Sequence, residues 1–223
     1  MERPFILNFK NYSEISAEKT VLLARTAQEA ARNSNADIVL APPQPSLALI
    51  TQTVTLPVIC QHIDDVKLGQ TTGFFVAEIA RSYGARGSIV NHSEHKIDLK
   101  SIDNLIRELR RLEMTSIVCA QTPHEVSEIA RFSPDFIAIE PPELIGSGKA
   151  VSKENPTIIT DSIKASKQYS NSTKVICGAG ITDKSDVAAA LDLGAEGILV
   201  ASGVIKAQSW YEKILGLVSP LLK

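Results

Sequence analysis

The feature that most constrains the fold is a repeated alternation between short runs of apolar, often β-branched residues and longer stretches with helical periodicity. Most of the short runs are continuously apolar, as in residues 136–139, which is typical of parallel strands covered on both faces. Eight such runs favour an α/β fold of the (β/α)8 type, a parallel eight-stranded barrel surrounded by helices, over a doubly wound sheet. The predicted strands are Phe5–Asn8, Ile38–Leu40, Val58–Cys60, Gly87–Asn91, Ser116–Cys119, Phe136–Glu140, Lys174–Cys177 and Gly197–Val200.

The stretches between the strands carry helix start and stop signals. Asp183 is a favourable N-cap for a helix that runs to Leu193, and Gly194 follows where glycine commonly ends helices. A dinucleotide-binding sheet would need a G-x-G-x-x-G turn after its first strand, but residues 8–11 here contain no glycine. Further helices are predicted over Ala17–Arg32, Ser101–Leu112 and Ser209–Val218.

Composition excludes several classes of function. The chain has 23 Lys+Arg and 25 Asp+Glu, and it lacks the basic stripe that binds nucleic acid. Its start has no secretory signal and no apolar run is long enough to cross a bilayer, so no membrane partner is predicted. Cys60, Cys119 and Cys177 lie far apart, which favours buried reduced thiols in a cytoplasmic protein. No linker interrupts residues 1–223, which predicts one domain.

The ends of the strands are where a barrel of this type places its active site. Period-two alternation in the first strand puts Asn8 and Lys10 on one face, opposite Leu7 and Phe9. If the apolar pair faces the helices, a lysine and an amide point into the mouth of the barrel. A lysine there is costly unless an anion meets it. A lysine that swings out to solvent remains the alternative.

The fourth strand ends in Asn91-His92-Ser93-Glu94-His95. Asn91 or Ser93 could cap a following short helix, which would place His92 at its N-terminus. The partial positive charge there disfavours imidazolium, so a neutral imidazole could act near pH 7. A polar loop histidine is the plainer alternative. A metal site using His92 and His95 is weaker, because no further ligand set is evident and no metal is predicted.

The sixth strand ends in a carboxylate, Glu140, directly after four apolar residues. Desolvation disfavours the charged form of such a group and makes it a stronger base when ionised. Residues 141–142 are Pro-Pro, and the far side of the loop 143–149 holds two glycines, Gly146 and Gly148. A stiff start, an apolar tip and a glycine-rich end describe a mobile lid. An ordinary loop after a surface glutamate remains possible.

Small residues follow the seventh and eighth strands, in Gly178-Ala179-Gly180 and in residues 199–203. They let backbone N–H groups approach a ligand closely, and the loops after the last two strands are the usual phosphate site of such barrels. Glycines also serve simple tight turns, so each motif alone is weak. Two in succession indicate a phosphate site.

Together these segments resemble the triosephosphate isomerase family, whose members are TIM barrels. The matching segments run in order over the whole chain, and the compact length with the lid sequence is similar to the archaeal branch. The resemblance implies interconversion of dihydroxyacetone phosphate and glyceraldehyde 3-phosphate, in glycolysis and gluconeogenesis. The segments that carry it are Asn8-Phe9-Lys10, Asn91-His92-Ser93-Glu94, residues 139–149, Gly178-Ala179-Gly180 and residues 199–203.

Residue roles are also implied by the resemblance. Glu140 is the expected base, neutral His92 polarises the substrate carbonyl, and Lys10 supplies positive charge, while Asn8 donates a hydrogen bond. Glu94 matches a carboxylate beside the lysine. No metal or organic cofactor is needed, because the substrate carbonyl already acidifies the neighbouring C–H. Backbone amides expected to hold the phosphate belong to Ile145, Gly146, Gly180, Ala201 and Ser202.

The chain departs from the family pattern in its phosphate loops and its length. The family often has serine at the position of Gly180 and a glycine pair at that of Ala201-Ser202, which leaves the detailed phosphate contacts open. Residues 61–73 resemble the loop that docks into a neighbouring subunit, which predicts a homodimer or a homotetramer. Two alternative functions are a different sugar-phosphate enzyme, such as a pentose-phosphate epimerase, and a phosphate-binding or assembly protein of the same fold without catalysis.

Overall fold

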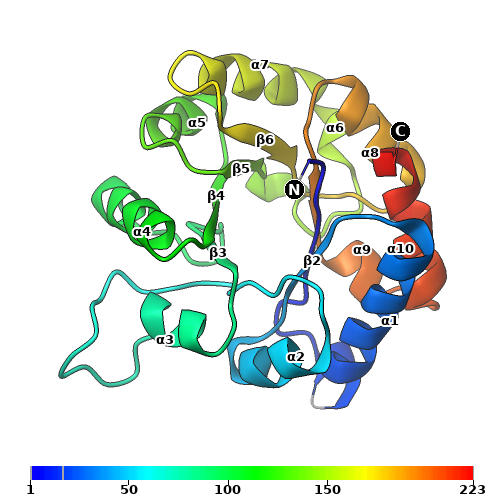
Figure 1. The fold of residues 1–223 in the computed structure, drawn as a ribbon. Coiled ribbons are helices and arrows are strands. Elements are labelled where there is room, and N and C mark those ends of the chain that lie inside the picture. Colours follow the sequence, from blue (N-terminus) through cyan, green and yellow to red (C-terminus); the bar gives the residue numbers. More distant parts are fainter. Residues whose placement is uncertain (1, 17, 223) are drawn as a thin grey trace.

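The computed structural model describes residues 2–16 and 18–222. Within them, seven parallel strands form one sheet in the order β2-β1-β7-β6-β5-β4-β3. The sheet curves into a barrel with the helices outside it (Figure 1). The strands are β1 (Phe5–Asn8), β2 (Ile38–Ala41), β3 (Gly87–Val90), β4 (Thr115–Ala120), β5 (Phe136–Ile139), β6 (Lys174–Cys177) and β7 (Ile198–Val200).

Residues 57–60 fill the remaining place in the ring, between β2 and β3. The amide of Ile59 donates to the Leu40 carbonyl over 2.8 Å, and that of Cys60 donates to the Gly87 carbonyl over 2.9 Å. Bridges therefore join this segment to β2 at one end and to β3 at the other. The predicted strand Val58–Cys60 is corrected to two isolated bridges. Val58 is bridged to β2 and Cys60 to β3, so this segment does not make two successive bridges with the same neighbouring strand. The ring of eight is nevertheless closed.

Helices occupy the predicted stretches, with small differences at their ends. The predicted start of the first helix, Ala17, lies outside the described residues. The predicted Ser101–Leu112 begins earlier, because the Asp98 side chain accepts a hydrogen bond from the Ser101 amide and acts as the N-cap. The helices are α1 (Glu18–Ser34), α2 (Leu47–Thr53), α3 (Ala77–Ser82), α4 (Leu99–Arg111), α5 (Pro123–Ala130), α6 (Val151–Glu154), α7 (Pro156–Lys167), α8 (Lys184–Asp192), α9 (Ser202–Ile205) and α10 (Trp210–Val218), with the 3-10 turns η1 (Ser13–Ile15), η2 (Gln44–Ser46), η3 (Pro142–Leu144) and η4 (Ser219–Leu222).

Asp183 caps α8 as predicted. Its side chain accepts hydrogen bonds from the Ser185 and Asp186 amides, and the Asp186 side chain accepts one from the Asp183 amide, which completes a capping box. Gly194, just beyond the helix, has φ +96°, a conformation that L residues with a Cβ rarely adopt. The local sequence therefore sets both ends of this helix.

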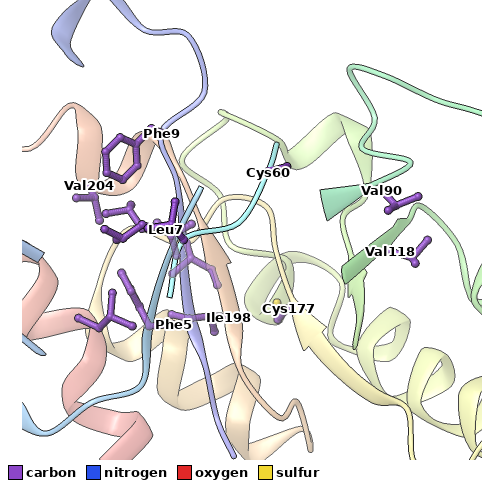
Figure 2. Packing of buried hydrophobic residues seen from close by; sticks show 14 of the residues in the cluster. Phe5, Leu7, Phe9, Cys60, Val90, Val118, Cys177, Ile198 and Val204 are labelled. Atoms are coloured by element: carbon purple, nitrogen blue, oxygen red, sulfur yellow. The ribbon is translucent and has the colours of Figure 1, made fainter. Parts of the chain in front are cut away.

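The two faces of each strand belong to two separate cores. Phe5, Leu7 and Phe9 pack outward against the helices, and Figure 2 shows them along one side of β1 with Val204 close to Phe9. The opposite faces fill the interior of the barrel with a second buried cluster, made of Ile6, Val39, Ala41, Ile59, Ile89, Ile117, Cys119, Phe136, Ala138, Ile176 and Leu199. Period-two alternation continued one step beyond this cluster places Asn8 and Glu140 at the mouth.

The three cysteines are unpaired and buried. Burial raises the pKa of the Cys60 thiol to about 12, so this thiol is protonated at neutral pH. The prediction of buried thiols is thereby confirmed. Among the described residues, no helix combines the length and apolarity that crossing a bilayer requires.

Candidate active site

The backbone conformation of Lys10, just beyond the end of β1, determines the direction of its side chain. It has φ +48°, an uncommon conformation for a residue with a Cβ. The side-chain oxygen of Asn8 accepts a hydrogen bond from the Lys10 amide over 3.0 Å, and the Gln61 amide group donates to the Lys10 carbonyl over 3.1 Å. These two contacts turn the lysine inward, and only 13% of its side chain is exposed. The alternative of a solvent-facing lysine is wrong.

Glu94 provides the ionic partner of Lys10. Its Oε2 lies 3.0 Å from the Lys10 Nζ, while 64% of the Glu94 side chain is exposed. An ion pair with one open side is weak in water. The ammonium group therefore keeps a side from which a negatively charged ligand can approach.

His92 follows β3 in a turn, and the predicted short helix after it is absent. The next helix, α4, begins at Leu99. Between them the His95 amide donates to the His92 carbonyl over 2.7 Å, which closes a single turn that residues 96–98 do not continue as a helix. A helix dipole therefore does not act on this ring.

A hydrogen bond sets the tautomer of the His92 ring instead. The Glu94 amide donates to the ring Nδ1 over 3.1 Å, so Nδ1 serves as an acceptor and carries no proton. The proton of the neutral ring is then on Nε2. That nitrogen lies 3.6 Å from the Glu140 Oε2, which is too far for a hydrogen bond between them. In this tautomer the ring presents an N–H donor at the mouth of the barrel, and the Glu94 amide, not the helix terminus that the sequence suggested, selects it.

Glu140 continues the inward register of β5 and is 4% exposed. Its amide donates to the Ala120 carbonyl over 2.8 Å, which fixes the backbone at the end of the strand. Gly178 provides the space for the carboxyl, because a Cβ at that position would lie 2.5 Å from the Glu140 Oε1. The alternative of a surface glutamate is wrong.

Two buried polar atoms here lack a hydrogen-bond partner, the Glu140 Oε2 and the His92 Nε2. A buried carboxylate oxygen without a donor costs free energy. The two atoms lie 3.6 Å apart and belong to residues that follow different strands, β3 and β5. A ligand with a donor and an acceptor in the right places would satisfy both.

The predicted lid has a defined structure. It starts with the 3-10 turn η3 directly after Pro141, and both the amide and the hydroxyl of Ser147 donate to the Leu144 carbonyl, over 3.2 and 2.8 Å. Leu144 is buried beneath the loop. Gly146 and Gly148 have φ +69° and +74°, which supports the prediction that glycines shape the far side of the loop.

The lid tip and the last two strand ends enclose a cavity of about 30 Å³. Gly180 lies against the end of the lid, because a Cβ there would be 1.8 Å from the Lys149 carbonyl oxygen. A serine, which the family often has at this position, would not fit this arrangement. The cavity is lined by the predicted residues Lys10, Glu140, Ile145, Gly146, Gly180, Ala201 and Ser202, and also by Tyr12, Ala179, Ile181, Leu199, Val200 and Gly203.

A second cavity, of about 840 Å³, opens on the other side of Lys10. Asn8, His92 and Glu94 line it, so the residues predicted for catalysis and phosphate binding all border one of two neighbouring spaces. Lys10 and Tyr12 line both. The ammonium group therefore lies between the cavity that the backbone lines and the one that holds the imidazole.

Gln61 and Tyr12 were not predicted. Gln61 donates to the carbonyls of Lys10 and Ala41, over 3.1 and 3.0 Å, and thereby ties two strand ends together. Its position directly after an apolar run was a usable signal. Tyr12 has no comparable signal. It lies at the site because the chain turns at Lys10, and the positive φ of Lys10 cannot be predicted from the sequence.

A metal centre at His92 and His95 finds no support. The His95 ring stacks on His62 instead, with centroids 3.6 Å apart and planes 15° apart. Within residues 2–16 and 18–222, no three His, Cys, Asp or Glu side chains are grouped so that they could hold a metal ion.

Comparison with known proteins identifies the family. A sequence model described as triosephosphate isomerase matches residues 4–218. The triosephosphate isomerase of Methanothermobacter thermautotrophicus is 44% identical over 214 residues, which cover 96% of this chain and 93% of the relative. That of Methanothermus fervidus is 40% identical over 222 residues, 99% of this chain and 100% of the relative. That of Cenarchaeum symbiosum is 45% identical over 202 residues, 91% and 90%. The chain belongs to the triosephosphate isomerase family.

Proposed function

We propose that the chain interconverts dihydroxyacetone phosphate and D-glyceraldehyde 3-phosphate, with Glu140 as the base that moves the proton. The observation that carries the proposal is the pair of unsatisfied buried atoms, the Glu140 Oε2 and the His92 Nε2, next to Lys10. A three-carbon substrate offers the complementary groups, namely an acidic C–H for the carboxylate and a carbonyl oxygen for the imidazole N–H.

In the reaction, Glu140 removes a proton from the carbon beside the carbonyl and returns it to the adjacent carbon through an enediolate. Negative charge then develops on the carbonyl oxygen. The N–H of neutral His92 and the ammonium group of Lys10 stabilise that charge, and Asn8 contributes its amide N–H. The Asn8 oxygen already accepts the Lys10 amide, which leaves the NH2 group for the substrate.

The lid and the phosphate loops have a separate task. Backbone N–H groups of Ile145, Gly146, Gly180, Ala201 and Ser202 are proposed to bind the phosphate. Leu144 and Ile145 bring apolar side chains to the closed lid, which keeps water from the enediolate. Excluding water suppresses loss of phosphate from that intermediate. The small volume of the cavity, about 30 Å³, means that the lid has to move for substrate to enter.

A coupled assay for isomerase activity, run with and without a chelator, tests the function. We expect turnover in both directions that the chelator leaves unchanged. Failure to turn over either triose phosphate would refute the proposal. Loss of activity on chelation would refute the cofactor-free mechanism. A role in glycolysis and gluconeogenesis stays a prediction that follows from the family. A single domain and a cytoplasmic location also stay predictions, the latter supported by the three unpaired thiols.

A homodimer, or a homotetramer built from it, is the proposed assembly. The loop that precedes α3 extends away from the barrel (Figure 1), and it carries two exposed apolar side chains, Leu68 at 58% and Phe74 at 52%. Large apolar residues on a projecting loop favour burial in a partner. Light scattering at micromolar concentration should give the mass of two or four chains. A monomer under those conditions would contradict the proposal.

A further inference from the structure

Asn91 connects the His92 loop to its surroundings. It is 1% exposed, and φ at this residue is +59°. Its side-chain oxygen accepts the Ile97 amide over 3.1 Å. Its NH2 group donates to the Cys119 carbonyl and to the Glu125 Oε1, both over 2.9 Å. One oxygen and both N–H bonds of the amide are therefore used.

These bonds close the loop 91–97 on itself. The Asn91 side chain reaches across to Ile97, at the other end, while the His95 amide donates to the His92 carbonyl and the Glu94 amide to the ring. The imidazole is therefore tied to this loop through its Nδ1. Its place in the barrel mouth depends on where the whole loop is anchored.

Glu125, in the first turn of α5, anchors the loop from outside. Its Oε1 accepts hydrogen bonds from Asn91 and from the ammonium group of Lys96, and its Oε2 accepts the Gln121 amide over 2.8 Å. One carboxylate thus joins the loop 91–97, the residue after β4 and helix α5. Its own amide is capped by the Thr122 hydroxyl over 3.2 Å, which fixes the position of the helix start.

The carboxylate form of Glu125 is maintained by its partners. Burial raises the pKa of the Glu125 carboxyl, but the hydrogen bonds from Lys96, Gln121 and Asn91 outweigh burial and hold that pKa below its usual value. The group is therefore charged at neutral pH, and it can accept all three bonds at once. A protonated carboxyl would lose part of this capacity.

The same network reaches the base. The Asn91 side chain donates to the Cys119 carbonyl. Burial first, and the Glu140 carboxyl second, raise the pKa of the Cys119 thiol, so this thiol and the proposed base interact. A displacement of the loop therefore changes the position of the imidazole relative to the carboxylate. Misplacing a catalytic group by about 1 Å can cost about 100-fold in rate.

We infer that Glu125 is a positioning residue for the isomerisation, which acts through Asn91 to hold His92 opposite Glu140. The inference rests on the proposed function. Among the described residues that line the two cavities, Glu125 is not present, so it acts without touching the substrate.

Glu125→Ala and Glu125→Gln test the inference, with Glu128→Ala as the matched control. Glu128 lies one turn further along α5, where its contact is His124 at 3.6 Å between Oε2 and Nδ1. We expect Glu125→Ala to lower kcat about tenfold or more, with less than about a twofold change in KM, since the phosphate side is untouched. Glu125→Gln keeps an acceptor for Asn91 and should recover part of kcat even if the alanine variant folds poorly.

The nitrogen NMR signals of the imidazoles provide a readout that a general loss of stability does not move. The chain has four histidines, and His92→Gln identifies the signals of His92. We expect Glu125→Gln to weaken the preference for a proton on Nε2, while Glu128→Ala leaves the spectrum unchanged. An unchanged His92 spectrum together with an unchanged kcat in folded Glu125→Gln would overturn the inference. An inactive wild-type protein would refute the function, yet the spectra would still test the positioning.

Discussion

The two sides of the barrel mouth differ in what they present to a ligand: one presents polar side chains and the other mainly backbone. On the side formed by β1, β3 and β5 lie the side chains of Lys10, His92 and Glu140, the proposed catalytic groups, and hydrogen bonds from other residues hold them or their backbone in place. On the side formed by β6, β7 and the lid, residues such as Gly180 and Ala201 line the cavity with little or no side chain. The proposed function therefore uses side chains on one side and backbone on the other.

The difference predicts two kinds of failure. A substitution on the first side removes a chemical group, which should lower kcat. A substitution on the second side adds atoms where the backbone has to approach a ligand, which should change substrate binding and lid closure. The following variants test how cleanly the two sides separate, from the largest expected effect to the smallest.

Glu140→Gln should show the largest effect. The variant keeps the size of the side chain and removes the base, so we expect kcat to fall by about 10³-fold or more. Affinity for inorganic phosphate, measured as competitive inhibition of residual activity or by calorimetry, should stay within about threefold. Near-normal turnover would refute the assignment of Glu140 as the base.

Lys10→Ala should break the separation between the sides, because Lys10 lines both cavities. Loss of a charged donor of this kind costs about 100-fold in kcat, and KM should rise as well since the phosphate loses a counter-charge. Steady-state kinetics with both substrates provides the measurement. If kcat and KM both stay unchanged, Lys10 does not belong to the site.

Gly180→Ala and Gly146→Ala form a matched pair on the backbone side. Both glycines have φ +69°, but a Cβ at position 180 would meet the Lys149 carbonyl oxygen at 1.8 Å, whereas a Cβ at position 146 has nothing within 4 Å. The positive φ costs each variant about 1 kcal/mol, and the close contact adds a further cost at position 180 alone. We expect Gly180→Ala to raise KM about tenfold or more, and Gly146→Ala about fivefold or less. Equal effects would show that space at the end of the lid does not matter.

Asp183→Ala and Asp183→Asn should have the smallest effect on activity, because they alter only the helix behind the phosphate loop. Loss of the N-cap costs about 1 kcal/mol in the alanine variant, and asparagine should keep most of it. Chemical denaturation at pH 7 measures this difference, with kcat expected to be unchanged. A fall in kcat without a loss of stability would show that α8 controls the site more directly.

The pH dependence of Asp183 follows from its hydrogen bonds. The Ser185 side chain first, and then the Asp186 and Ser185 amides, hold the pKa of the Asp183 carboxyl below its ordinary value of 3.8. Its contribution to stability is therefore present above pH 3.8 and is lost as the pH falls through the lowered folded value. Denaturation curves of the wild-type protein and Asp183→Asn should converge in that range. A gap that persists there would mean that the charge does not matter.

Prediction from sequence succeeded wherever a local pattern carried the information. The apolar runs located the strands, alternation along the first of them turned Asn8 inward, and the four apolar residues before Glu140 indicated that its carboxyl is removed from water. It failed where the backbone turns unexpectedly. Asn91 has positive φ, which ends β3 one residue early and replaces the predicted helix by a turn, and Lys10 likewise leads the chain to the unpredicted Tyr12.

The sequence alone determined where the strands lie along the chain, which residues follow them and which glycines shape the lid. Hydrophobic periodicity and the backbone conformations open to glycine are properties of neighbouring residues. The tertiary structure decided what those ends do to one another. Only folding brings Glu125 beneath Asn91, the Glu94 amide to the His92 ring and the Lys149 carbonyl against Gly180. Hydrogen bonds and close contacts between such segments depend on distances that local patterns do not encode.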